Sequence, residues 1–104
     1  MADLSQEDWA KQLESNNNAV ILDVRTQDEV DQGIIPNAIH MDIHNGQGFI
    51  DELETLDKEK TYYVYCRSGA RSAQACTIME QIGFNKAYNL LGGIMNWQGE
   101  ISSI

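Results

Sequence analysis

A cysteine followed by two arginines and a glycine forms the most chemically suggestive stretch of the chain, residues 62–72, Tyr-Tyr-Val-Tyr-Cys-Arg-Ser-Gly-Ala-Arg-Ser. An apolar, aromatic run typical of a strand ends at Cys66, and a helical pattern begins near Arg71. Unpaired N–H groups at a helix N-terminus favour negative charge, and Arg67 and Arg71 are permanently cationic. We therefore expect the pKa of the Cys66 thiol to be lowered, which would make it a nucleophile at neutral pH.

The loop after this cysteine has the composition of an anion-binding cradle. Gly69 can adopt backbone conformations closed to other residues, so that successive N–H groups can point inward. Cys66 and Arg71 are spaced as C-x4-R, whereas phosphatases with a cysteinyl nucleophile have C-x5-R and a cradle sized for a phosphoryl group. The shorter spacing favours something smaller, such as a single terminal sulfur carried on the thiolate. The alternative is a buried structural cysteine beside two solvated arginines.

Strands and helices that alternate along the chain must position this loop. The apolar run 19–24 predicts a strand buried on both faces of a parallel sheet, Thr61–Tyr65 predicts a central strand, and residues 86–90 predict a short last strand. Helices are predicted to begin near Ser5, Thr26, Phe49 and Arg71. The alternation predicts an α/β domain whose central parallel sheet has four or five strands and helices on both faces.

Length and composition limit the classes of function. The 104 residues predict a single domain spanning residues 1–104, and a formal charge of −9 argues against nucleic acid or an anionic membrane as a partner. The sequence has no apparent signal peptide or membrane-length apolar run. Two cysteines without zinc-type spacing predict free thiols in a reducing compartment, so we expect a cytoplasmic protein. No cofactor is predicted, and no metal, because His40 and His44 lack further ligands nearby.

Residues 66–72 resemble the active-site loop of the single-domain rhodaneses, which are thiosulfate:acceptor sulfurtransferases. Two flanking segments also resemble motifs of that family. Asp23-Val24-Arg25 followed by Glu29 resembles its first motif, and residues 91–97, Leu-Gly-Gly-Ile-Met-Asn-Trp, resemble its closing L-x-G-G-x-x-x-W. The segment 33–38 resembles the family's G-H-I-P-G-A, with isoleucine and asparagine in place of the histidine and second glycine. The resemblance spans residues 19–97.

This resemblance implies a rhodanese-like three-layer sandwich and a set of supporting residues. Arg25 and Glu29 would pair to brace the loop, and Asp23 would approach the active-site region. Gly92 and Gly93 would let the backbone come close to the catalytic loop. The alternative for Glu29 is that it only caps its own helix.

The resemblance also implies a double-displacement sulfur transfer. Cys66 would attack the outer sulfur of a donor such as thiosulfate, release sulfite and carry a persulfide, which a thiol or cyanide acceptor would then remove. The residues expected to bind the anionic donor and the transferred sulfur are Arg67, Ser68, Gly69, Ala70, Arg71 and Ser72. Arg71 is expected either to hold the donor or to fold back onto an internal carboxylate. A protein could also serve as the sulfur acceptor.

Three other functions remain open at the level of sequence. One is a small cysteine phosphatase or arsenate reductase, which the C-x4-R spacing disfavours. Another is a persulfide carrier or regulatory binding module without useful turnover. The third is a redox switch between Cys66 and Cys76, although Cys76 borders an apolar helix stripe and is more simply a small residue at the edge of the core.

Overall fold

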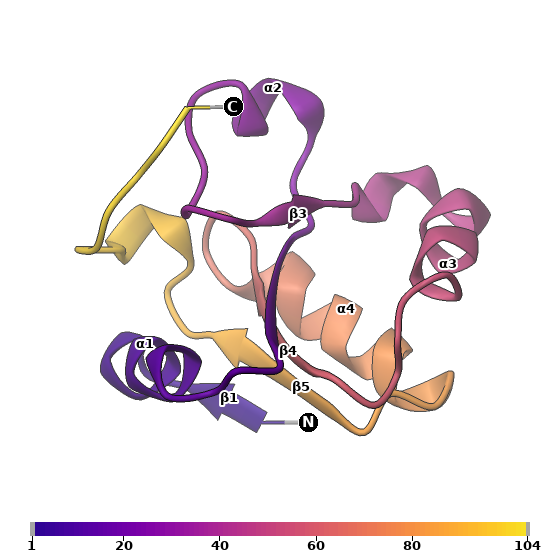
Figure 1. Ribbon diagram of the computed structural model, residues 1–104. Helices are drawn as coiled ribbons and strands as arrows, with labels where there is room; N and C mark the ends of the chain where they lie inside the picture. The colour runs from indigo at the N-terminus through magenta and orange to yellow at the C-terminus, as the bar shows by residue number, and fades with distance from the viewer. Residues whose placement is uncertain (1, 104) are drawn as a thin grey trace.

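The computed structural model describes residues 2–103 and contains one five-stranded sheet, with strand order β1-β5-β4-β2-β3 and every pairing parallel (Figure 1). The strands are β1 (Ala2–Leu4), β2 (Ala19–Asp23), β3 (Ile39–His40), β4 (Thr61–Tyr65) and β5 (Lys86–Leu90). The prediction of an α/β fold around a central parallel sheet is confirmed.

Four α-helices accompany the sheet in the described residues: α1 (Gln6–Glu14), α2 (Gln27–Val30), α3 (Gln47–Leu53) and α4 (Ala70–Gln81). Two 3-10 turns, η1 (Ile43–Asn45) and η2 (Ile94–Asn96), complete the pattern. The first two helices begin where the sequence predicts. Ser5 caps α1 by accepting the Asp8 N–H, and Thr26 and Glu29 form a reciprocal capping box at the start of α2.

Two apolar cores lie on opposite faces of the sheet because successive β4 side chains point in opposite directions. Tyr63 and Tyr65 pack with Trp9 of α1, whereas Tyr62 and Val64 pack with α3 and α4. Figure 1 shows α1 on one side of the sheet and α3 and α4 on the other. The three layers therefore follow from one strand whose residues are all buried.

The position of β4 decides where Cys66 lies. This strand pairs with β2 on one side and β5 on the other, and all five of its residues are buried. Cys66 follows its last residue directly, and α4 begins four residues later. The cysteine is therefore held at the carboxyl edge of the innermost strand, where open parallel sheets bind ligands.

The two ends of the chain differ from the sequence-based expectation. Strand β1 was not predicted, since three residues are too few to show a period. Trp97 was expected on a terminal helix, but the structure has only the single turn η2 before it. Trp97 nevertheless packs on the protein, with its ring centroid 5.5 Å from that of Trp9. Within residues 2–103, no helix is long and apolar enough to cross a membrane.

Candidate active site

The Cys66 side chain is wholly buried at the base of the loop that joins β4 to α4. The Gly69 N–H donates to its sulfur at 3.1 Å, and the Ser72 hydroxyl oxygen lies 3.3 Å from the same sulfur. Gly69 has φ +107°, a conformation that L side chains rarely adopt. The glycine therefore turns its N–H back toward the sulfur, as an anion-binding loop requires.

The surroundings of Cys66 act on its pKa in opposite directions. Burial raises the pKa of the thiol, because a thiolate loses hydration in the interior. Hydrogen bonds lower it: the Ser72 hydroxyl does so when its single hydrogen is turned toward the sulfur, and the N–H groups of Ser72, Gly69 and Ser68 do so as well. The hydrogen bonds outweigh burial, and the pKa lies below its ordinary value. This site stabilises a thiolate.

The segment after β5 holds the loop from the other side. Gly93 has φ +60°, and a Cβ atom there would collide with the Arg67 carbonyl group. The Ile94 N–H donates to the Cys66 carbonyl at 2.9 Å, and the Met95 N–H donates to the Arg67 carbonyl at 3.0 Å. The close backbone approach expected of the double glycine is thus present at Gly93, where no larger residue fits.

Arg71 forms a bidentate ion pair with Glu29. Its two terminal nitrogens donate to the two carboxylate oxygens at 2.6 and 2.8 Å. Glu29 also accepts from the N–H and the hydroxyl of Thr26, so capping and ion pairing occur together. The Arg71 hydrogen bond is the main cause that lowers the pKa of Glu29 to about 2, against the opposing effect of burial. The guanidinium of Arg71 therefore ties the start of α4 to α2.

Arg25 does not pair with Glu29, which corrects the pairing inferred from the first motif. Its guanidinium donates to both carboxylate oxygens of Asp23, with the shortest contact 2.7 Å, and to the Gly33 carbonyl at 2.7 Å. Both side chains are nearly inaccessible, at 6% and 0% exposed. They share the carboxyl end of β2, and two residues of spacing suffice for the ion pair. Asp23 thus fixes Arg25 beside the loop.

Arg67 differs from the other two arginines. Its side chain is exposed, and among residues 2–103 it is the only arginine without an ion pair. It lines a cavity of about 510 Å³ together with Arg25, Glu29, Gln32, Ile94 and Met95. Ser68 and Ala70 complete the loop between Cys66 and Arg71, and Ala70 is exposed like Arg67. Arg67 is therefore the free cation nearest the cysteine in sequence, at the edge of a cavity that could admit an anion.

Residues 6–100 match the family model described as the rhodanese-like domain. The chain belongs to the rhodanese-like family. It is 39% identical over 90 residues to the putative sulfurtransferase YtwF of Bacillus subtilis, covering 86% of this chain and 84% of that protein. It is 35% identical over 89 residues to the thiosulfate sulfurtransferase GlpE of Coxiella burnetii, covering 86% and 80%. These relationships support sulfur transfer as the general activity.

A solved structure shares the whole fold. The crystal structure of a rhodanese-like domain protein from Staphylococcus aureus superimposes with a TM-score of 0.86 at 30% identity, covering 100% of this chain and 99% of that one. The resemblance drawn from residues 66–72 and their flanking motifs is therefore confirmed at the level of family and fold.

Two residues of this rhodanese-like site were missed by sequence reasoning. Asn89 of β5 is 2% exposed, and its side chain lies between Ser72, Gly69 and Asp3 of β1. The available signal was an asparagine inside a short strand, where asparagine is disfavoured. Asp3 gave no signal, since it contacts Asn89 only through the pairing of β1 with β5.

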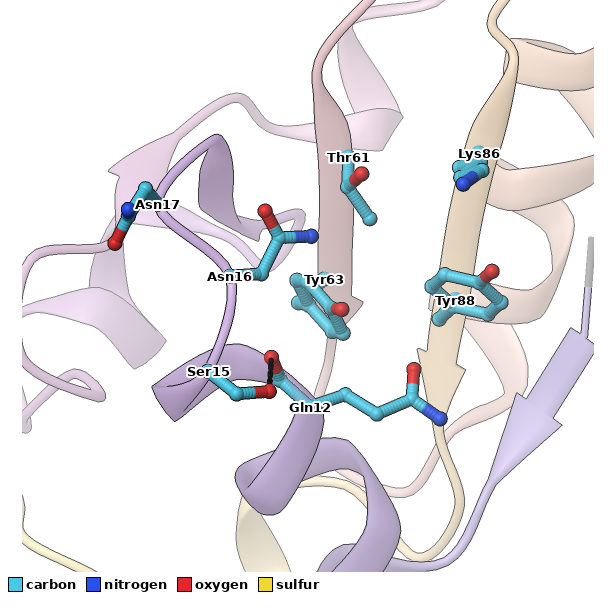
Figure 2. Close-up of a pocket in the computed structure, with 8 residues that line it drawn as sticks. All are labelled: Gln12, Ser15, Asn16, Asn17, Thr61, Tyr63, Lys86 and Tyr88. Atoms are coloured by element: carbon cyan, nitrogen blue, oxygen red, sulfur yellow. Dashed lines mark hydrogen bonds between the residues drawn. The ribbon is translucent and has the colours of Figure 1, made fainter.

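A second hollow lies at the opposite end of the strands (Figure 2). It has a volume of about 340 Å³, and its lining includes Thr61 and Tyr63 of β4, Lys86 and Tyr88 of β5, and polar side chains at the end of α1. No cysteine or histidine of the described residues lines it. Since Thr61 begins the strand that Cys66 follows, this hollow is separated from the rhodanese-like loop by the length of β4.

Proposed function

We propose that this rhodanese-like domain transfers sulfane sulfur through a persulfide on Cys66. The observation that carries the proposal is the set of donors around the sulfur, namely the Gly69 N–H at 3.1 Å and the further N–H groups of Ser68 and Ser72. Donors arranged in this way stabilise a thiolate before reaction and can stabilise the charged outer sulfur afterwards.

The proposed reaction has two balanced steps. In the first, the Cys66 thiolate attacks the outer sulfur of thiosulfate, the S–S bond of the donor breaks, and sulfite leaves with the bonding electron pair. The product is the persulfide Cys66–S–S⁻. In the second step a thiolate or cyanide attacks the outer sulfur, and Cys66 leaves as the thiolate. The proposal includes no general base, because the lowered pKa of Cys66 favours the thiolate as the attacking species.

Arg67 and Arg71 have different roles in this proposal. Arg67 binds the anionic donor, since it is exposed and lines the cavity beside the loop. Arg71 is occupied by Glu29, so its role is to hold the loop and to add positive charge near Cys66. Because Cys66 has no exposed surface in the resting structure, the loop residues that cover it must shift for the donor sulfur to reach it.

The deciding experiment is an intact-mass measurement before and after incubation with thiosulfate. We expect a gain of about 32 Da that cyanide removes, which is the signature of one persulfide sulfur. Cys66→Ser should show no gain, whereas Cys76→Ser should gain the same mass as the wild type. Loading that persists in Cys66→Ser would overturn the proposal.

The rival functions predict other outcomes of the same assay. A persulfide carrier would gain the mass but show negligible turnover with small acceptors. A phosphatase would show no gain and would hydrolyse an aryl phosphate above the Cys66→Ser background. Since the cycle requires a free thiol, we place the reaction in a reducing, cytoplasmic setting.

A further inference from the structure

A buried polar chain runs from Cys66 to the edge of the sheet. The Ser72 hydroxyl oxygen lies 3.3 Å from the Cys66 sulfur and 2.5 Å from the side-chain carbonyl oxygen of Asn89. The Asn89 amide nitrogen donates to the Gly69 carbonyl at 3.1 Å and to an Asp3 carboxylate oxygen at 3.0 Å. Ser72 is fully buried, and Asn89 nearly so, so water cannot freely replace the contacts among Cys66, Ser72 and Asn89, whereas Asp3 at the outer end of the chain of contacts is exposed.

The orientation of the Asn89 amide follows from its neighbours. A backbone carbonyl and a carboxylate can only accept hydrogen bonds, so the amide nitrogen must face Gly69 and Asp3. The amide oxygen then faces Ser72 and has no hydrogen to give. Two oxygens at 2.5 Å require a hydrogen between them, and the Ser72 hydroxyl is the one that can supply it.

This arrangement limits what Ser72 can do for the sulfur. A hydroxyl has a single hydrogen, so it can donate to Asn89 or to Cys66, but not fully to both. With the hydrogen on Asn89, the hydroxyl presents lone pairs to the sulfur and can accept from a thiol S–H. With the hydrogen turned toward a thiolate, the buried Asn89 oxygen loses its donor, which carries a free-energy penalty.

We propose that Asn89 is a positioning residue that withholds the Ser72 hydrogen from the resting Cys66 sulfur. The inference rests on the proposed role of Cys66 as the nucleophile. In the persulfide the negative charge moves to the outer sulfur, so the inner sulfur no longer needs that hydrogen. Asn89 therefore disfavours the free thiolate relative to the sulfur-loaded form and biases the first step toward loading.

Other ionisable groups also act on Cys66. Arg71 and Cys76 of α4 interact electrostatically with it, and Asp3 of β1 lies beyond Asn89. None of these side chains is altered in the variants below. A difference between the variants therefore reports on the hydroxyl and the amide rather than on a change of charge.

The test measures the pH midpoint for alkylation of Cys66 by iodoacetamide in four proteins: wild type, Ser72→Ala, Asn89→Leu and the double variant. Leucine is close in size to asparagine and cannot accept the hydroxyl hydrogen. We expect Asn89→Leu to lower the midpoint by about 0.5 to 1 pH unit, the worth of one recovered hydrogen bond. Ser72→Ala should change the wild-type midpoint by less than about 0.3 pH unit, yet raise it in the Asn89→Leu background by about the amount gained.

The direction in which the alkylation midpoint shifts distinguishes a positioning role of Asn89 from a purely structural one. Loosening the loop by removing the Asn89 contact to Gly69 would weaken N–H donation to the sulfur and raise the midpoint. A raised or unchanged midpoint in Asn89→Leu, or equal effects of Ser72→Ala in both backgrounds, overturns the proposal. If Asn89→Leu does not fold, Asn89→Ala replaces it. If that also fails, a rise of about 0.5 pH unit or more in Ser72→Ala alone is the overturning result.

A second measurement separates this inference from the proposed function. The alkylation midpoints require no sulfur transfer, so they test Asn89 even if Cys66 never carries a persulfide. Where loading occurs, stabilising the thiolate must shift the equilibrium between thiosulfate and the persulfide. We expect Asn89→Leu to hold about three- to tenfold less persulfide at equilibrium with thiosulfate and sulfite. Equal loading beside a lowered midpoint would refute the bias toward the loaded form.

Discussion

The two cysteines of this protein are equally buried, but their pKa values are shifted in opposite directions. Cys66 and Cys76 are both fully inaccessible, and both are free thiols. Burial raises the pKa of Cys76 to about 12, whereas the pKa of Cys66 lies below its ordinary value. The difference lies in the backbone around each sulfur. Cys76 sits inside α4, where the N–H groups are used within the helix, and Cys66 sits before α4, where they are free to turn toward the sulfur.

This comparison shows that burial alone does not decide the reactivity of a thiol. Desolvation opposes the thiolate at both positions. Only the loop supplies donors that compensate for it, and it can do so because Gly69 and Gly93 permit a backbone path that other residues cannot follow. The direction of each pKa shift is thus set by the backbone that surrounds the sulfur.

The largest expected effect on the rate of sulfur transfer comes from replacing each cysteine separately by alanine. Cys66→Ala should abolish sulfite release from thiosulfate with cyanide as acceptor, because no other sulfur is activated. Cys76→Ala should keep the rate within about twofold and cost about 1 kcal/mol of stability, since it removes one buried sulfur from the core. Rates from sulfite assays and unfolding in urea measure both. A comparable loss of rate in both variants would show that the cysteines act together.

Alkylation should distinguish the two thiols without any mutation. In the folded protein at pH 7, iodoacetamide should modify Cys66 at least about a hundredfold faster than Cys76, whose thiolate is scarcely populated. Peptide mass mapping at timed intervals gives the two rates. In denaturant the rates should converge, because both cysteines then have ordinary surroundings. Similar alkylation rates in the folded state would contradict the inference that the two buried thiols differ in their thiolate population.

Gly93→Ala should damage the loop around Cys66 while leaving Cys76 in place. The added methyl would meet the Arg67 carbonyl oxygen, so the loop must move and the thiolate loses its aligned donors. We expect sulfur loading to slow about tenfold or more. Gly46→Ala is the matched control, because Gly46 has a similar φ of +58° but an added Cβ there meets nothing within 4 Å. It should carry the backbone strain without the loss of loading.

The smallest expected effect concerns the ion pair between Arg71 and Glu29, which anchors the Cys66 loop. Glu29→Gln should destabilise the fold by about 1 to 2 kcal/mol at neutral pH. The pKa of Glu29 is lowered from 4.5 to about 2, so its contribution is present above pH 4.5 and is lost as the pH falls toward 2. Unfolding curves of wild type and variant should therefore approach each other across that range.

A surface pair provides the control for this measurement. Glu54→Gln removes the exposed i, i+4 contact with Lys58 and should cost less than about 0.5 kcal/mol. A difference between Glu29→Gln and wild type that persists unchanged as the pH falls to about 2 would show that the lost stability does not come from the ionised carboxylate.

Local patterns in the sequence predicted much of this protein. The apolar run before Cys66 indicated a buried strand, and the spacing to Arg71 indicated a small anion cradle. Thr26 and Glu29 indicated a capped helix. Each of these features depends on residues within a few positions of one another. Short-range steric and hydrogen-bonding preferences are sufficient to determine them.

The partners of the charged and polar side chains could not be predicted in the same way. Arg25 binds Asp23 and Arg71 binds Glu29, although sequence proximity also allowed Arg25 to bind Glu29. The choice depends on the distance between α2 and α4, which the packing of the sheet sets. Asn89 and Asp3 reach the site only because β5 lies between β4 and β1.

The sequence by itself therefore determined the candidate reactive element, a cysteine and its loop at the end of a buried strand. The tertiary structure alone decided which groups surround it, namely Glu29 on Arg71, Gly93 against Arg67, and Asn89 behind Ser72. The physical reason is the distance along the chain over which each kind of interaction acts. Backbone preferences act over a few residues, whereas a buried polar group takes whichever partner the packing of distant strands and helices brings within hydrogen-bond distance.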